Sequence, residues 1–420
     1  MWKTFVNFSA LILGLSSGNI VLPPTAHAGP AKEVIELIIK ALPKGEARER
    51  IIEKAISGSL KGGFKHGSDT VFGDKGEKKQ SPKAKRPTSR PQGVKCPPLQ
   101  VSKACWDRGI IAFKKGDYKT AIQEFRVFAV HGNAPAQSFL GHMYLKGQGV
   151  DRDYSEAAKW FRKAAEQRNI MAQASLGLMY DNGFGVARDH NEAAKWYRKA
   201  AVQGNPNAQF NLAQLYGKGL GVDLDYKNAA KWYRKAAIQG VSQAQSLLGL
   251  LYQVGAGVPQ DYREATTWFR KAGLQGDAIA QFNLGQIYRE GLGVIQDYKK
   301  AAKWYRKAAI QGNRKAQFNL GVMHLKGHGV NRSDEESAKW FRRAAERGNA
   351  IAQYNLGGMY KMGQGVARDY VQAHMWLNIS AANGLKQGRS KRDNIEKQMT
   401  KSQINEAQEL AREWVRRRQN

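Results

Sequence analysis

An aromatic residue followed by asparagine recurs along the chain, two and three residues after a repeated alanine. Such a pair offers apolar area beside an amide that both donates and accepts hydrogen bonds, which suits peptide recognition. The alternative interpretation, favoured for the aromatic residues, is that the ring packs against the next unit and the asparagine only solvates a helix. The candidate partner-binding residues are Phe210, Asn211, Phe282, Asn283, Phe318, Asn319, Tyr354 and Asn355.

A second recurring pattern is lysine, two other residues, arginine and lysine. The whole chain is basic, with 67 Lys and Arg against 35 Asp and Glu, a net charge of +32. The pattern predicts a positive ridge that attracts anionic envelope polymer, either peptidoglycan or lipopolysaccharide. The competing interpretation is a solvated face whose long stems shield tryptophan rings. The ridge residues are Lys195, Arg198, Lys199, Lys231, Arg234, Lys235, Lys303, Arg306 and Lys307.

Nucleic acid is not an expected partner, because aromatic residues do not interleave with the exposed basic ones. The chain contains no His-Glu-x-x-His, Gly-x-Ser-x-Gly, Walker or Ser-x-x-Lys motif, and its eight histidines form no recurring column. These observations predict a protein that is not an enzyme and that needs no cofactor or metal.

The chain has two cysteines, Cys96 and Cys105. In an oxidising compartment they are expected to form a disulfide that closes a small loop. The alternative is two unrelated thiols, one of them buried beside Trp106.

The first 28 residues have the pattern of a secretory signal. Lys3 is followed by a mostly apolar stretch, and Ala26-His27-Ala28 is a small-residue site that predicts cleavage after Ala28. No later segment is apolar enough to span a bilayer, so we expect a periplasmic or secreted protein without a transmembrane segment in its mature chain. Short amphipathic helices are expected in residues 29–60, and a disordered basic linker with ten basic and three acidic residues in 61–95.

All these patterns lie on an internal repeat of 36 residues. An Ala-Gln pair and a Gly-x-Gly-Val turn keep the same step as a tryptophan column, seven times without insertion or deletion. The tryptophans are Trp160, Trp196, Trp232, Trp268, Trp304, Trp340 and Trp376. A period of this length indicates a solenoid.

Each unit has the pattern of a helical hairpin. Ala280, Leu284 and Tyr288 stand four residues apart and share one helix face. Gly285 in mid-helix predicts a close helix crossing, since glycine there costs about 1 kcal/mol relative to alanine. Asp297 stands where the N-cap of a second helix belongs.

The repeated pattern Ala-Gln-Phe-Asn-Leu-Gly, Tyr, Gly-x-Gly-Val, Asp-Tyr, Ala-Ala-Lys-Trp-Tyr-Arg-Lys-Ala-Ala resembles the Sel-one-like repeat (SLR) family, relatives of tetratricopeptide repeats. The resemblance implies an all-α, right-handed solenoid of antiparallel helix pairs with a concave groove. It also implies a protein-interaction scaffold or adaptor, of the kind that exported bacterial members provide in the cell envelope. The aromatic-asparagine pairs would line the groove and bind a protein or peptide.

The ends of the repeat array differ from its middle. Residues 96–132 resemble a shortened, tetratricopeptide-like unit, residues 133–384 hold the seven full units, and residues 385–420 are expected to form C-terminal capping helices. Such capping is expected because terminal units must cover the open faces of the stack. Thr400 and Gln403 predict a capping box at the start of the final helix.

Overall fold

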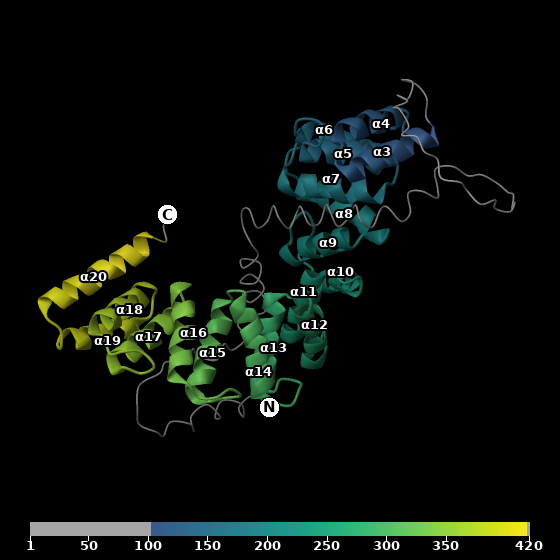
Figure 1. Cartoon of the computed structure of the whole chain (residues 1–420). Helices are drawn as coiled ribbons and strands as arrows, with labels where there is room; N and C mark the ends of the chain where they lie inside the picture. The colour runs from purple at the N-terminus through teal and green to yellow at the C-terminus, as the bar shows by residue number, and fades with distance from the viewer. Residues whose placement is uncertain (1–101, 418–420) are drawn as a thin grey trace, which may run out of the picture. The chain divides into compact units, whose positions relative to one another are not determined.

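The computed structural model of the chain describes residues 102–417, and all regular secondary structure there is α-helical. The 18 helices of this region form successive pairs, which confirms the predicted helical-pair solenoid. They fall into two compact units, residues up to 260 and residues from 261 (Figure 1). The predicted signal peptide, the amphipathic helices at 29–60 and the linker at 61–95 lie outside the described residues.

In each pair we call the first helix the A helix and the second the B helix. In the first unit the A helices are α3 (Lys103–Lys115), α5 (Ala134–Lys146), α7 (Ile170–Asn182), α9 (Pro206–Lys218) and α11 (Ser242–Val254). Its B helices are α4 (Tyr118–Val130), α6 (Tyr154–Glu166), α8 (His190–Val202) and α10 (Tyr226–Ile238).

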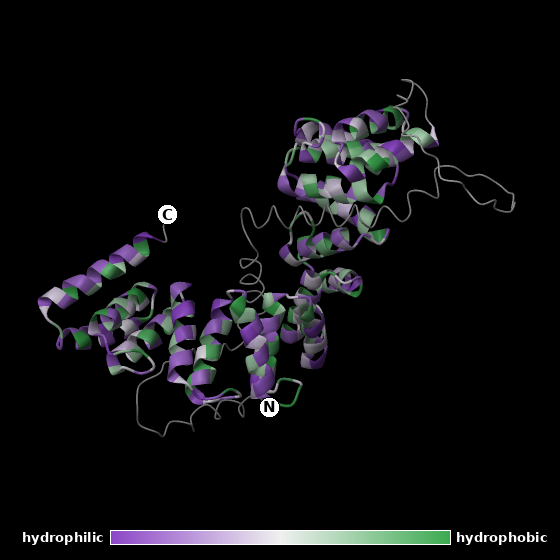
Figure 2. Ribbon diagram, viewed as in Figure 1, coloured by the Kyte–Doolittle hydropathy of each residue, from purple (hydrophilic) through white to green (hydrophobic). Residues whose placement is uncertain are grey.

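The second unit begins with a B helix and ends with two further helices. Its A helices are α13 (Ala278–Glu290), α15 (Arg314–Lys326) and α17 (Ala350–Met362). Its B helices are α12 (Tyr262–Leu274), α14 (Tyr298–Ile310), α16 (Asp334–Glu346) and α18 (Tyr370–Ala382), followed by α19 (Lys386–Glu396) and α20 (Lys401–Arg416). Hydrophilic residues dominate the visible faces of α14, α16 and α20 (Figure 2).

Side-chain caps define where the helices begin. The carboxylate of Asp297 accepts a hydrogen bond from the backbone N–H of Lys300, as the sequence predicted for this N-cap. In the same way the Asn205 side chain accepts from the Ala208 N–H at the start of α9. These caps satisfy amide groups that lack a partner within the first helical turn.

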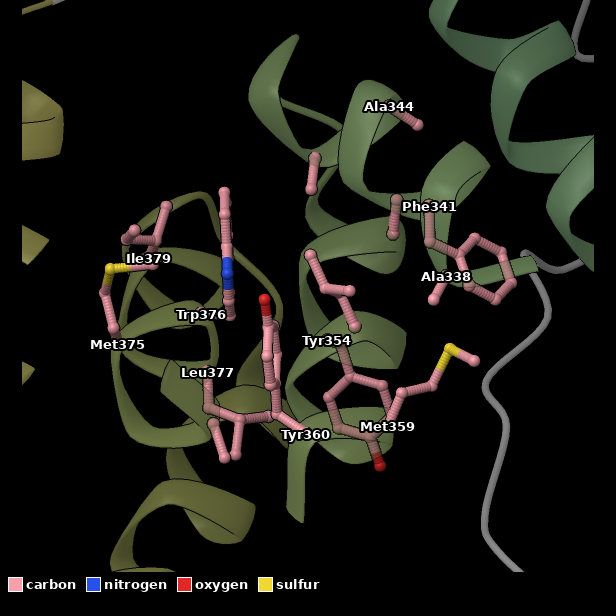
Figure 3. Close-up of a cluster of buried hydrophobic side chains, with 14 of the residues drawn as sticks. Ala338, Phe341, Ala344, Tyr354, Met359, Tyr360, Met375, Trp376, Leu377 and Ile379 are labelled. Carbon is pink, nitrogen blue, oxygen red and sulfur yellow. The ribbon is translucent and has the colours of Figure 1, made fainter. Parts of the chain in front are cut away.

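The apolar core of each repeat lies between its A helix and its B helix. A Cβ on Gly285 would lie 2.5 Å from the ring of Tyr305, a fully buried residue of α14, so the predicted close crossing is confirmed. The same contact joins Gly177 to Tyr197 in the first unit. Near the C-terminal end, side chains from α16, α17 and α18 meet in one apolar cluster that includes Phe341 and Leu377 (Figure 3).

Both ends of the described region carry extra helices. The helix pair α3–α4 packs on α5, and α19 and α20 pack on α18. The Thr400–Gln403 capping box is present at the start of α20, as predicted. Cys105 is buried in α3, whereas Cys96 lies outside the described residues, so the Cys96–Cys105 disulfide stays a prediction.

Candidate binding surfaces

The aromatic-asparagine pairs lie on the A helices α9, α13, α15 and α17, and the three phenylalanine rings turn towards the B helix of the same pair. The ring of Phe210 lies 5.8 Å from that of Tyr233, centroid to centroid, and Phe282 lies 5.8 Å from Tyr305. Phe318 is only 3% exposed, and its ring lies 5.6 Å from that of Phe341. Packing within the pair therefore accounts for all three rings without a partner, although Phe210 and Phe282 are half-buried and only Phe318 is buried.

The four asparagines differ in what their amides do. Asn283 is 7% exposed, and its amide donates to the Ile279 carbonyl at 3.0 Å. Asn319 is half-buried beside Tyr305; burial raises the pKa of that phenol, and the Asn319 side chain opposes the rise. Asn211 is half-buried, and its amide makes no hydrogen bond within residues 102–417. Asn211 and Asn319 are thus the members most available to a partner.

The last pair is covered by the C-terminal helices. Tyr354 and Asn355 are 3% and 5% exposed. The Lys391 ammonium of α19 lies 4.3 Å from the centroid of the Tyr354 ring, and burial lowers the pKa of this lysine. In this structure the surface predicted at Tyr354 and Asn355 is therefore occupied by the chain itself.

The basic ridge lies on the outward faces of the B helices α8, α10 and α14, and all nine of its predicted residues are exposed. The arginines nevertheless have structural partners in the following pair. Arg198 donates to the Tyr216 hydroxyl at 2.6 Å, and Arg234 donates to that of Tyr252. Arg306 instead meets the Nε2 atom of His324 at 3.4 Å, because histidine replaces the tyrosine there. Each arginine therefore joins neighbouring pairs.

On each of α8, α10 and α14 the ridge consists of a lysine, an arginine and a second lysine, which we call a ridge triplet. The second lysine of each triplet lies over the preceding tryptophan. The Lys199 ammonium is 3.9 Å from the Trp196 ring centroid, and Lys235 and Lys307 make the same contact at 4.5 and 4.6 Å. This geometry is a cation–π interaction, and the lysine stem covers the ring. The ridge thus shields tryptophan, as the competing interpretation proposed, while its charges stay exposed.

The first lysine of each triplet differs between repeats. Lys195 pairs with Glu192 at 2.7 Å. The residue equivalent to Glu192 is Asn228 in α10 and Lys300 in α14. Lys231 and Lys303 therefore have no glutamate at this position to pair with. The triplets of α10 and α14 therefore carry more uncompensated charge than that of α8.

The 36-residue unit with this geometry matches the Sel1 repeat model seven times, at residues 134–169, 170–205, 206–241, 242–277, 278–313, 314–349 and 350–385. The chain belongs to the Sel1 repeat family. The matched span is shifted by one residue from the predicted 133–384.

Two solved structures are similar to this Sel1 repeat protein. One is c5321, a protective antigen present in uropathogenic Escherichia coli strains, with 34% identity, a TM-score of 0.53, and coverage of 75% of this chain and 76% of that one. Another is a Sel1 repeat protein from Oxalobacter formigenes, with 33% identity, a TM-score of 0.51, and coverage of 58% and 96%. No curated protein sequence matches the chain.

A network of side-chain amides, centred on buried glutamines, links successive Sel1 repeats and explains the Ala-Gln column. Gln209 is 4% exposed and donates to the Ala201 carbonyl of the preceding repeat at 3.0 Å. Its own carbonyl oxygen accepts from Gln239 at 2.8 Å. The sequence signal for this network is a polar residue repeated at a core position, which sequence reasoning missed.

We expect Gln209→Leu to lower the free energy of unfolding by about 2 kcal/mol, because it removes two hydrogen bonds of the Gln209 amide, one to the Ala201 carbonyl and one from Gln239. Urea unfolding followed by circular dichroism measures the loss. Gln317→Leu is the matched control: Gln317 also donates to a buried carbonyl, but its own oxygen has no partner, since Arg347 stands where the second glutamine belongs. The control should lose about 1 kcal/mol less; an equal loss would contradict a role for the second amide.

Within residues 102–417 no three His, Cys, Asp or Glu side chains come together as metal ligands would. In the same region no helix is long and apolar enough to cross a bilayer.

Proposed function

We propose that this Sel1 repeat protein is a non-enzymatic scaffold that binds a protein or peptide on the A-helix faces of its two compact units, with Asn211 as contact residue in the first unit and Asn319 in the second. The observation that carries the proposal is the Asn211 amide, which is half-exposed and makes no hydrogen bond within the described residues. An amide in this state can pair with the backbone of an extended segment at little desolvation cost. The half-exposed Gln214 lies one helical turn further along α9 and extends the polar strip.

Export to the periplasm or beyond, after cleavage behind Ala28, is part of the proposal. It rests on the signal pattern of residues 1–28. The relative from uropathogenic Escherichia coli is a protective antigen, which supports a location outside the cytoplasm. A role in the bacterial cell envelope follows from these two arguments together.

The variant Asn211→Ala/Asn319→Ala tests the contact residues. It should weaken capture of the partner from envelope extract roughly tenfold, since two hydrogen bonds of about 0.5–1.5 kcal/mol are lost. Quantitative pull-down against a series of bait concentrations measures the change. Asn191→Ala, an exposed asparagine of the B helix α8, is the control and should capture as well as the native protein.

A second function, binding of anionic envelope polymer by the basic ridge, is favoured by the uncompensated triplets of α10 and α14. The salt dependence of the affinity separates the two proposed functions, because the affinity of a protein that neutralises polymer charge falls steeply as the salt concentration rises. If Lys231→Glu/Lys303→Glu abolishes capture while the asparagine variant leaves it intact, the ridge is the binding surface and our first proposal is wrong.

A further inference from the structure

Arg168 has an unusual backbone conformation. Its φ is +66°, and among residues 102–417 it is the one non-glycine residue with a positive φ. In the other repeats the equivalent position is glycine, for example Gly204 and Gly240 with φ of +96° and +90°. A side chain in this left-handed region costs roughly 1 kcal/mol. Strain that persists in one repeat alone points to a function for that side chain.

Arg168 lines an open groove of about 550 Å³ between α6, α7 and α8, which we call the Arg168 groove. Three ridge residues of α8 line it too, so four cations surround it, against one acid, Glu166. The basic residues are Arg168, Lys195, Arg198 and Lys199, and all four are exposed. The groove therefore favours an anionic ligand.

The cations of α8 are held in place by their own contacts. Arg198 donates to Tyr216 at 2.6 Å, Lys199 lies over Trp196, and Lys195 pairs with Glu192. Arg168 has no ion pair within the described part of the chain. Its guanidinium is the donor left for a carboxylate, which arginine binds through two parallel hydrogen bonds.

The groove also has an apolar wall. Val202 lines it and is 70% exposed, and Ile238, the equivalent residue one repeat later, is 70% exposed. Large apolar side chains with this exposure gain free energy when a ligand covers them, in proportion to the area removed from water. A polysaccharide or nucleic-acid backbone offers charge but no apolar side chain to fill this wall.

We infer that the Arg168 groove binds an acidic peptide segment, with a carboxylate paired to Arg168 and a neighbouring apolar side chain against Val202. This is a second surface on the same scaffold, built on a B helix and the repeat junction rather than on the A-helix face. It rests on the proposed function only in that the ligand is a peptide.

Arg168→Gly is the decisive variant, because it restores the residue that the other repeats carry and so does not endanger folding. The probe is a short fluorescein-labelled peptide of Glu-Glu-Leu repeats, and fluorescence anisotropy measures its affinity. Arg168→Gly should weaken binding about tenfold, the usual effect of losing one charge-assisted pair, while thermal stability rises. Arg188→Gly, an exposed arginine of the neighbouring turn, removes the same charge and should bind as the native protein does.

Two results would overturn the inference. One is native affinity of the Arg168→Gly variant for the peptide. The other is equally tight binding of polyglutamate or duplex DNA, which would mean that charge alone is recognised. The variant Asn211→Ala/Asn319→Ala should bind the probe normally, so loss of peptide binding in the groove and loss of partner capture on the A-helix face can be told apart.

Discussion

Gly221→Ala is expected to destabilise the first unit by about 3 kcal/mol, because it adds a clash with backbone to the strain of a left-handed residue. Gly221 is the second glycine of its Gly-x-Gly turn and has a φ of +64°. A Cβ there would overlap the carbonyl group of His190, at the start of the B helix in the preceding repeat. Backbone at a helix start cannot move aside as a flexible side chain can, so the repeats would have to separate.

Gly240→Ala is the matched control. Gly240 also has a positive φ, +90°, but nothing lies within 4 Å of the position that its Cβ would take. It should therefore lose only the strain, about 1 kcal/mol. Urea unfolding followed by circular dichroism compares the two variants. Equal losses would show that the contact between the turn and the preceding helix contributes nothing.

Acidification is expected to cost about 3 kcal/mol of stability through His142 alone, by the linkage of proton binding to folding. His142 is 6% exposed in α5, and burial, helped by the charge of Lys146, lowers its pKa to about 4. The folded protein therefore keeps this imidazole neutral, whereas the unfolded chain takes up a proton below about pH 6.5. Stability should fall from that pH downwards and the loss should be complete below about pH 4.

His142→Leu should remove this part of the pH dependence, since Leu178 and Leu250 occupy the same position in the second and fourth repeats. Unfolding free energies at about pH 7 and pH 5 should differ by roughly 2 kcal/mol less in the variant than in the native protein. His131→Gln is the control, because His131 is exposed and glutamine stands at its position in the next five repeats. A native-like pH dependence of His142→Leu would refute the assignment.

The sequence determined the repeat and most of the local structure by itself. A period of 36 residues, caps such as Asp297 and a glycine such as Gly285 are local signals, and each kept its predicted role in the structure. Such signals depend on a residue and its near neighbours in the chain, which is why they can be read without tertiary contacts.

The candidate surfaces were harder to predict, because a fixed period only shows which residues form a column. It does not show what faces that column. Phe282 is predicted to line a groove; in the structure its ring packs on Tyr305 while the side chain stays half-buried, so the column alone could not show how much of it a partner can reach. Tyr354 is predicted to line the same groove, but α19 covers this residue. Both outcomes depend on distances between helices that local sequence does not encode.

What only the tertiary structure decided is therefore how neighbouring repeats meet. The periodic pattern could not reveal that Arg198 reaches the tyrosine of the next repeat or that the buried Gln209 side chain bonds to the preceding repeat. Nor could it reveal that Arg168 stands in a strained conformation beside an exposed valine. The physical reason is that the rise and rotation between repeats set these contacts, and both emerge from packing of whole helix pairs.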